Sequence, residues 1–294
     1  MNALTDAAAA PADVIVSRGY WAGVLGRLAR DPVAMLCLFV LAIIVLGAVA
    51  APLIAPCDPA VGRVVMRLKP VGTPGHILGT DELGRDMLTR LLYGGRLSLL
   101  MGIVPVALAV IIGGALGTVA GFVGGFTNTA IMRTTDVFFA FPSVLLAVAI
   151  AGALGPGLAN TLLALTIVLV PPLVRVTEAA TTQVRSHDYV EAARATGAGS
   201  LTIIRVHILG NILGPILVYA TSLLSVSIIL AAGLSFIGLG AKPPTPEWGL
   251  MLNNLRNAIY SQPLIAALPG VLIFAVSLSF NLLSDGLRAA MGVE

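Results

Sequence analysis

Five long stretches without a charged residue constrain this chain more than any other feature of its sequence. They cover residues 32–57, 97–132, 137–174, 208–241 and 257–284. The hydrocarbon core of a bilayer is about 30 Å thick, so a helix needs about 20 apolar residues to cross it. Only 11% of the 294 residues are charged, whereas about a quarter are charged in a typical soluble domain. The sequence therefore predicts an all-helical membrane protein.

The third stretch is long enough for two crossings. It contains Gly152-Ala-Leu-Gly155-Pro156-Gly157, which a helix would not continue through. We therefore predict six transmembrane helices, at roughly 33–55, 98–121, 131–153, 159–177, 211–232 and 264–284. An even number of crossings places both termini on one side of the membrane. Lys and Arg are divided nine against eight between the two sides, so the positive-inside rule assigns no orientation.

The segments outside these helices allow different interpretations. Residues 1–16 have no apolar periodicity and are predicted to be disordered. Residues 17–30 are interpreted either as a helix in the headgroup layer or as a cytoplasmic extension of the first span. The apolar face of that helix carries Tyr20, Trp21, Val24, Leu25 and Leu28.

Two long loops face the side opposite the N-terminus. In residues 58–96, Asp81 or Asp86 is placed to cap a helix at the membrane interface, leading into the second span. Residues 233–263 contain the stretch Gly238–Gly249, which is too rich in Pro and Gly for regular structure, and Trp248 there is interpreted as an interface anchor. Each loop either merely connects two spans or contacts a partner that delivers solute.

The second span carries glycines at intervals of four. Such a row allows a second helix to approach backbone to backbone. We therefore predict helix packing, with any solute-lining role secondary, along Gly113, Gly117, Gly121 and Gly125.

A polar stretch between the fourth and fifth spans is the candidate functional segment. Asp188 and Glu191 have the spacing of a capping box, and Gly197 suits a left-handed residue after a short helix. Ser200 is then expected to cap a second short helix with Leu201, Ile204 and Ile208 on its apolar face. The pattern predicts two short helices that form a compact projection beside the membrane.

The chain lacks an energy source of its own. Neither Lys69 nor Lys242 follows the glycine pattern of a Walker A loop. The span interiors carry no acidic or basic residue, which argues against an ion-coupled carrier. The nearest charges are Glu178 and the pair Arg133 and Asp136, which we interpret as a surface-anchoring ion pair. The projection at 185–210 is therefore interpreted as a lever for an ATP-hydrolysing partner, or else as a segment lying on the membrane.

These residues resemble a known family. Glu191-Ala-Ala-x-x-x-Gly197, followed by Ile208-Leu209, resembles the EAA motif of permease subunits in bacterial ATP-binding-cassette importers. Four other stretches resemble the C-type permease of the dipeptide/oligopeptide/nickel branch. They are Gly79-Thr-Asp-Glu-Leu-Gly-Arg-Asp86, Ser235-Phe-Ile-Gly-Leu-Gly240, Pro243-Pro-Thr-Pro-Glu-Trp-Gly249 and Phe280-Asn-Leu-Leu-Ser-Asp-Gly-Leu-Arg288.

The resemblance implies a bacterial inner-membrane protein with both termini in the cytoplasm. It implies a second homologous permease, two ATPase subunits that bind ATP and Mg, and an external solute-binding protein. This chain would bind no cofactor, metal or nucleic acid and would catalyse no reaction. The implied ATPase-coupling residues are Asp188, Glu191, Ala192, Ala193, Arg194, Gly197, His207 and Leu209. The motif usually ends in Leu-Pro, whereas Gly210 follows Leu209 here.

We therefore predict a cytoplasmic N-terminal segment at 1–31, a first span with its periplasmic loop at 32–96, and a permease core of five spans at 97–294. The coupling loop at 178–210 belongs to that core. The function implied is the permease of an ATP-driven importer of di- or oligopeptides. A nickel or glutathione importer is the near alternative, and an ion-coupled carrier or a passive channel is the distant one.

Overall fold

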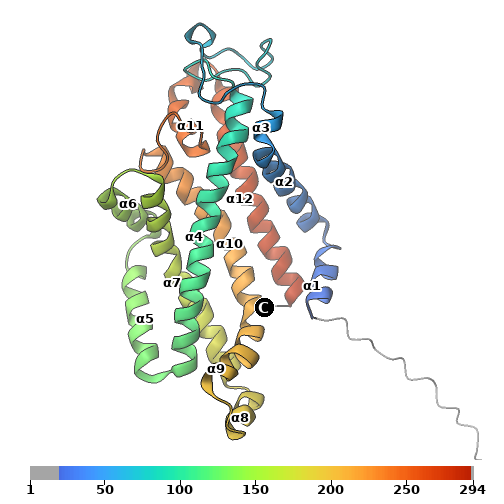
Figure 1. Ribbon diagram of the computed structural model, residues 1–294, viewed down its shortest axis with the longest axis vertical. Helices are drawn as coiled ribbons and strands as arrows, with labels where there is room; N and C mark the ends of the chain where they lie inside the picture. The colour runs from blue at the N-terminus through green and yellow to red at the C-terminus, as the bar shows by residue number, and fades with distance from the viewer. Residues whose placement is uncertain (1–19, 293–294) are drawn as a thin grey trace, which may run out of the picture.

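The computed structural model describes residues 20–292 of the chain. Regular structure in that range is helical, and none of the described residues forms a β-strand. The longest helices run side by side along the long axis and form one elongated bundle (Figure 1). The all-helical fold is therefore confirmed. The predicted disorder at 1–16 lies outside the described residues.

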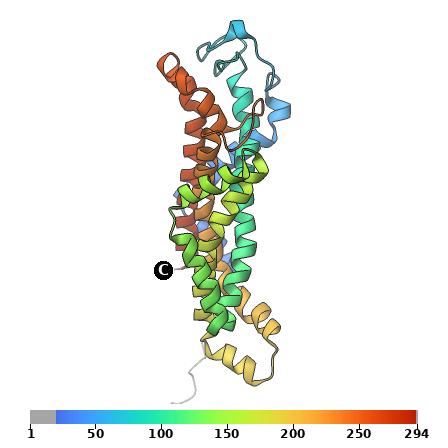
Figure 2. The same ribbon diagram turned by 90° about the vertical axis from the view of Figure 1, so that its left-hand side faces the viewer.

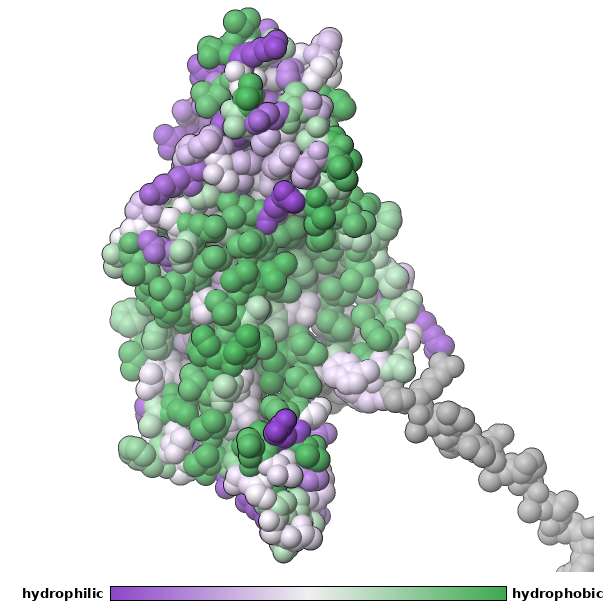
Figure 3. All heavy atoms as spheres, viewed as in Figure 1, coloured by the Kyte–Doolittle hydropathy of each residue, from purple (hydrophilic) through white to green (hydrophobic). Residues whose placement is uncertain are grey.

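Among residues 20–292, five helical segments are long and apolar enough to cross a membrane. The face seen in Figure 3 carries a broad apolar zone between more polar ends. Leu36, Phe39 and Leu46 on the first of these helices are 62%, 63% and 65% exposed, as expected of side chains in contact with lipid. The chain is thus a multi-pass membrane protein. The five segments are α2 (Pro32–Val49), α4 (Met87–Val123), α7 (Leu158–Arg185), a run from α9 (Ser200–Ile203) through α10 (Leu209–Phe236), and α12 (Pro263–Met291).

The predicted span at 131–153 is wrong as a single straight helix. This region forms α5 (Gly125–Phe139) and α6 (Ser143–Leu154), whose axes differ by 89°. Pro142 lies at the break, where it lacks an N–H and disfavours helical backbone in the residue before it. The pair supplies a sixth crossing only if both helices count as one broken span.

A helix leads into the second span, as predicted, and it is continuous with that span. Helix α4 is continuous from Met87 to Val123, so the expected interfacial segment is its first part. Asp86 is the N-cap, and its Oδ2 accepts a hydrogen bond of 2.8 Å from the N–H of Thr89. Of the two predicted caps, Asp86 is therefore the correct one. The short α3 (Ala51–Ile54) precedes the loop that leads to it.

Helix α4 packs closely against α7 through glycines. A Cβ atom on Gly113, Gly117 or Gly121 would lie 2.9, 2.6 or 2.7 Å from the Cβ of a residue on α7. Such distances allow no side chain, so the two backbones touch along this row. Gly125 does not belong to it, because α4 ends at Val123 and nothing lies within 4 Å of the Gly125 Cβ position.

The N-terminal helix α1 (Tyr20–Leu28) lies beside the end of α12. Val24 and Leu28 are buried there, and the Arg27 Nε donates a 2.7 Å hydrogen bond to the carbonyl of Ala290. Tyr20, Trp21 and Leu25, which were predicted to share the apolar face with them, are exposed. Part of the apolar face therefore packs on protein, and the rest is free to enter the headgroup layer.

The first long loop, residues 55–86, is held by a buried ionic cluster. Asp81 accepts a 2.7 Å hydrogen bond from the Arg85 Nε, and the Arg90 Nε lies 3.3 Å from the same carboxylate oxygen. Arg90 also donates to the carbonyls of Pro59 and Pro244. Asp81 therefore organises this loop rather than capping a helix. A 3₁₀ turn, Val64–Met66, lies within the loop.

The stretch Gly238–Gly249 was predicted to lack regular structure, and it does so as far as Glu247. The rest of residues 233–263 contains the end of α10, helix α11 (Trp248–Asn254) and a 3₁₀ turn at Arg256–Tyr260. Glu247 caps α11 by accepting from the N–H groups of Gly249 and Leu250 at 2.9 and 2.8 Å. Its carboxylate also accepts 2.8 Å from the Ser98 hydroxyl of α4.

Trp248 is a core residue and not the predicted interface anchor. It is 1% exposed, and its Nε1 donates 2.9 Å to the carbonyl of Leu91. Gly94 and Gly95 leave room for the indole ring, because their Cβ positions lie 3.2 and 2.9 Å from it. The Glu-Trp-Gly stretch of the second long loop thus fastens that loop to α4.

Candidate functional site

Residues 186–208, which we call the foot, connect α7 to α10 beyond one end of the bundle (Figure 1). The turned view shows the foot bending away from the axis of the long helices (Figure 2). It comprises α8 (Asp188–Ala195), a short loop, α9, and the segment Ile204–Ile208. All eight predicted coupling residues lie in the foot or directly after it.

The start of α8 differs from the predicted capping box. His187, with extended backbone angles, is the N-cap residue, and no side chain caps this end by a hydrogen bond. Asp188 and Glu191 lie inside the first turn. Their carboxylates there still interact favourably with the positive end of the helix dipole.

The end of α8 follows the sequence prediction. Gly197 has φ +83°, which is the left-handed conformation expected of the residue after the cap. The N–H of Ala198 bonds to the carbonyl of Ala193 at 3.1 Å, and that of Gly197 to the carbonyl of Arg194 at 2.9 Å. These two bonds form a Schellman motif, which reverses the chain after two turns of helix.

The second helix of the foot is not the separate element that the sequence predicted. It continues from Ser200 into α10 without a break, through a π-helical turn at Ile204–Ile208. Gly199, and not Ser200, is the N-cap residue. Gly210, which replaces the proline usual in the motif, lies inside the continuous helix.

The buried side of the foot also differs from the predicted face. Of the three predicted residues, Ile208 is buried and Ile204 is half-buried against the same cluster, but Leu201 is 68% exposed. Ile203, which was not predicted, is buried together with Ile208. These two are five residues apart, about 140° around a regular α-helix of 3.6 residues per turn. The π turn brings Ile203 and Ile208 to one side, and intervals of three and four residues do not predict this pairing.

The other side of the foot is open. Asp188, Glu191 and Ala192 are exposed on α8, while Val190 is fully buried beneath them. Val190 anchors the helix in a cluster with Ile203, Ile208 and residues of α4, α7 and α10. The foot is thus a short helix with a buried base and an open face that is acidic and small in side-chain size.

The remaining predicted residues divide between the two sides. Ala193 is half-buried and packs against the buried cluster. The Arg194 guanidinium lies 5.3 Å from the centre of the Phe122 ring, although the residue is exposed. His207 is half-buried, and Leu209 is 38% exposed. Only part of the motif is therefore available to a partner.

Sequence reasoning missed Tyr189, which connects the two helical parts of the foot. Its ring stacks on His187 with 5.5 Å between centroids and lies 6.0 Å from the ring of His207. The Asn211 Nδ2 donates 3.3 Å to its hydroxyl oxygen. No spacing rule predicts a contact between residues 18 and 22 positions apart, so the sequence carried no signal for it.

A family model described as the binding-protein-dependent transport system inner membrane component matches residues 113–292, which include the whole foot. The chain belongs to this family. A second model, the N-terminal TM domain of oligopeptide transport permease C, matches residues 19–70 of the permease. These two matches confirm the family resemblance seen in the sequence.

Two curated relatives cover most of this permease. The di/tripeptide transport system permease protein DppC of Pseudomonas aeruginosa is 46% identical over 254 residues, which is 85% of this chain and 84% of that protein. The glutathione transport system permease protein GsiD of Pectobacterium atrosepticum is 44% identical over 225 residues, 76% of this chain and 75% of that protein.

A solved structure has the same fold as the core of the permease. It is an inward-facing form of the MetNI methionine ABC transporter, with a TM-score of 0.57 and 20% identity. The match covers 69% of this permease and 97% of the matched chain. At this level of identity it establishes the fold of an importer permease and nothing about the solute.

The predicted ion pair near the third span has a different main partner. Arg133 lies 3.9 Å from Asp136, whereas the Arg175 Nη2 on α7 lies 2.6 Å from it. All three side chains are partly or largely exposed. Arg175 also lies 4.4 Å from the centre of the Phe139 ring. The carboxylate of Asp136 therefore ties the end of α5 to α7.

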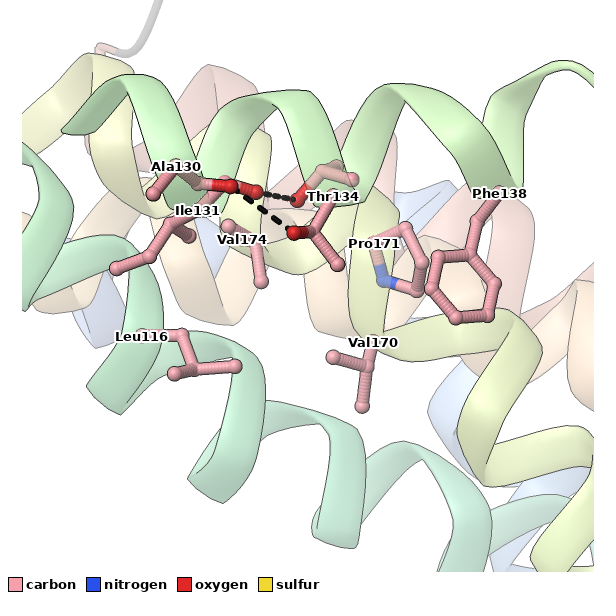
Figure 4. Close-up of a pocket in the computed structure, with 9 residues that line it drawn as sticks. Leu116, Ala130, Ile131, Thr134, Phe138, Val170, Pro171 and Val174 are labelled. Atoms are coloured by element: carbon pink, nitrogen blue, oxygen red, sulfur yellow. Dashed lines mark hydrogen bonds between the residues drawn. The ribbon is translucent and has the colours of Figure 1, made fainter. Parts of the chain in front are cut away.

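Next to the ion pair of Asp136 and Arg175, residues of α4, α5 and α7 line an apolar cavity of ≈ 290 Å³ (Figure 4). Thr134 and Thr135 line it, but their hydroxyls donate to the carbonyls of Ala130 and Ile131, each at 2.9 Å. Both threonine hydroxyl groups of the cavity thus donate their hydrogen bonds within α5. The rest of its lining is apolar and offers a polar solute little to bind.

Proposed function

We propose that this permease forms part of the membrane path of an ATP-driven importer of short peptides, and that an ATPase subunit docks on the foot. The observation that carries the proposal is the open face of α8 above a buried base. Val190 fixes the helix to the bundle, so a force applied at Glu191 or Ala192 reaches the long helices. Small alanines allow close approach, and Glu191 offers a charged contact.

The energy for transport would come from the partners. The sequence of the permease has no Walker A loop, so ATP and Mg would be bound by two ATPase subunits and not by this chain. The dependence on a binding protein in the family description supports an external solute-binding protein as a further partner. A second homologous permease would complete the path, and nucleotide-driven movement would alternate its opening.

The solute class rests on the relatives. One relative is named for di- and tripeptides and another for glutathione, which is itself a tripeptide. Both names favour peptides over nickel. The family description also favours a binding-protein-dependent importer over an ion-coupled carrier or a passive channel.

Docking on the foot sets the orientation. The foot and both chain termini would face the cytoplasm of a bacterium, and residues 55–86 the outside of its inner membrane. The term inner membrane component in the family description supports this location. The end of α12 and the foot lie toward the same end of the molecule in Figure 1, as this orientation requires.

A charge reversal tests the docking face. Glu191→Arg should lower ATP-dependent peptide uptake by vesicles about tenfold or more, a loss of ~1.4 kcal/mol or more, because a charged contact becomes repulsive. Less ATPase subunit should also copurify with the permease. Asp285→Arg is the matched control. Asp285 is exposed on α12, outside the foot, and its substitution changes the charge by the same amount. Normal uptake and normal copurification in Glu191→Arg would refute docking through this residue.

A further inference from the structure

Tyr189 forms a further connection between α8 and α10, in addition to the chain itself and the packing of Val190. The covalent connection runs through residues 196–199, where Gly197 and Gly199 have no atoms within 4 Å of their Cβ positions. No other element packs against the Cβ side of either glycine. A displacement of α8 transmitted along the backbone alone would be partly absorbed there, because glycine resists torsion least.

The ring of Tyr189 bypasses this loop. On one side it stacks on His187, with an angle of 24° between the ring planes. On the other side it lies against His207 at 44°. The side chain of Asn211 donates to the Tyr189 hydroxyl at 3.3 Å and to the carbonyl of His207 at 2.6 Å. A single aromatic ring thus contacts the start of α8, the π turn and the first turn of α10.

The π turn determines where the ring of His207 lies relative to Tyr189. The N–H of Leu209 bonds to the carbonyl of Ile204, five residues earlier. A π turn within an α-helix is rare and is frequent at functional sites, since it shifts the helix register by one residue. Here the shift buries both Ile203 and Ile208, and it also presents the ring of His207 to Tyr189.

We propose that Tyr189 is a positioning residue, which together with the π turn at Ile204–Ile208 transmits movement of α8 into α10. The inference rests on the proposed docking of an ATPase on the foot and adds the route that the movement takes. Val190 holds α8 on the bundle from below, whereas Tyr189 links its edge to the one helix that continues unbroken from the foot into the membrane. Loss of this link leaves docking intact and weakens its effect on the transmembrane helices.

The test uses the assembled transporter in vesicles and measures peptide uptake and ATP hydrolysis in the same sample. Tyr189→Ala removes the ring and should lower the peptide taken up per ATP hydrolysed by roughly two- to thirty-fold, the range for residues that carry coupling between sites. ATPase copurification should stay normal. Tyr189→Phe keeps the ring and loses only a long hydrogen bond, so the ratio should stay near that of the wild type.

Deletion of Val206 tests the π turn separately. This side chain is 62% exposed, and its removal brings Ile203 and Ile208 to an interval of four, which a regular α-helix buries on one face. The deletion variant should therefore fold and still bind the ATPase, yet show the same loss of uptake per ATP. Phe39→Ala is the control, because Phe39 is 63% exposed on α2, outside the foot, and should leave the ratio unchanged.

The outcomes separate this inference from the docking proposal. An unchanged ratio in Tyr189→Ala would overturn it. Loss of ATPase copurification in Tyr189→Ala would also overturn it, because the residue would then be a docking contact. Tyr189→Leu, which retains apolar bulk, answers the same question should the alanine variant fail to accumulate. Normal ATPase binding and uptake in Glu191→Arg would instead refute docking, whatever Tyr189 does.

Discussion

The contact between α4 and α7 can be tested by adding a single methyl group at Gly117. In Gly117→Ala the new Cβ would lie 2.6 Å from the Thr177 Cβ, 2.6 Å from the Val174 carbonyl oxygen and 2.9 Å from the Glu178 nitrogen. Two of these three atoms belong to the backbone of α7. No change of side-chain rotamer can therefore relieve the clash, and the helices themselves have to separate.

The size of the effect follows from these distances. Nonbonded carbon atoms pack best at about 3.5–4.0 Å, so α7 must retreat by about 1 Å. Overpacking of this kind costs about 1–3 kcal/mol. Alanine returns up to about 1 kcal/mol through its better helix propensity. We expect a net loss of about 1–2 kcal/mol in the free energy of unfolding, which is a factor of roughly 5–30 in the unfolding equilibrium.

Gly114 provides a control of opposite sign. It lies three residues before Gly117 on the same helix, and nothing lies within 4 Å of its Cβ position. Gly114→Ala should therefore be neutral or stabilising by up to about 1 kcal/mol. Thermal unfolding of both variants in the same detergent measures the difference. Equal stability of Gly117→Ala and Gly114→Ala would refute the close packing of α4 on α7.

Two further predictions concern the ends of short helices. Gly197→Ala places a side chain at φ +83° and should lower the free energy of unfolding by about 1 kcal/mol. Gly199→Ala, where φ is −67°, should not lower it. Chemical unfolding of the purified permease distinguishes the two variants. Glu247→Ala removes the acceptor for two backbone N–H groups and for the Ser98 hydroxyl, which should cost about 1–3 kcal/mol and increase proteolysis of the loop at 237–247. Proteolysis at the wild-type rate would show that this cap does not hold the loop.

Much of the fold was predictable because the signals are local. The spans predicted at 33–55, 159–177 and 264–284 begin within one residue of α2, α7 and α12, since burial in hydrocarbon depends on the composition of each segment alone. Asp86 was recognisable as a cap, and Gly197 as a left-handed residue, from their immediate neighbours. The candidate foot was found in the same way, as a polar segment between two apolar ones.

The errors have two causes, which are contact between residues distant in the sequence and local backbone geometry that departs from the usual pattern. Trp248 was assigned to the membrane interface because Trp is enriched there, yet it bonds to Leu91, 157 residues away. Asp188 was assigned as a cap because it is the usual residue type, but the turn after α7 places His187 there. The apolar face of the foot was misread because a π turn changes the interval from four residues to five.

The sequence by itself determined that this protein is a helical membrane permease, because apolar length and the Glu-Ala-Ala segment are properties of contiguous residues. The tertiary structure alone decided which of those residues are open to a partner and how the foot connects to α10. Val190, Tyr189 and Ile208 take their places through packing among α4, α7 and α10. Such packing depends on distances in space between side chains that no linear pattern specifies.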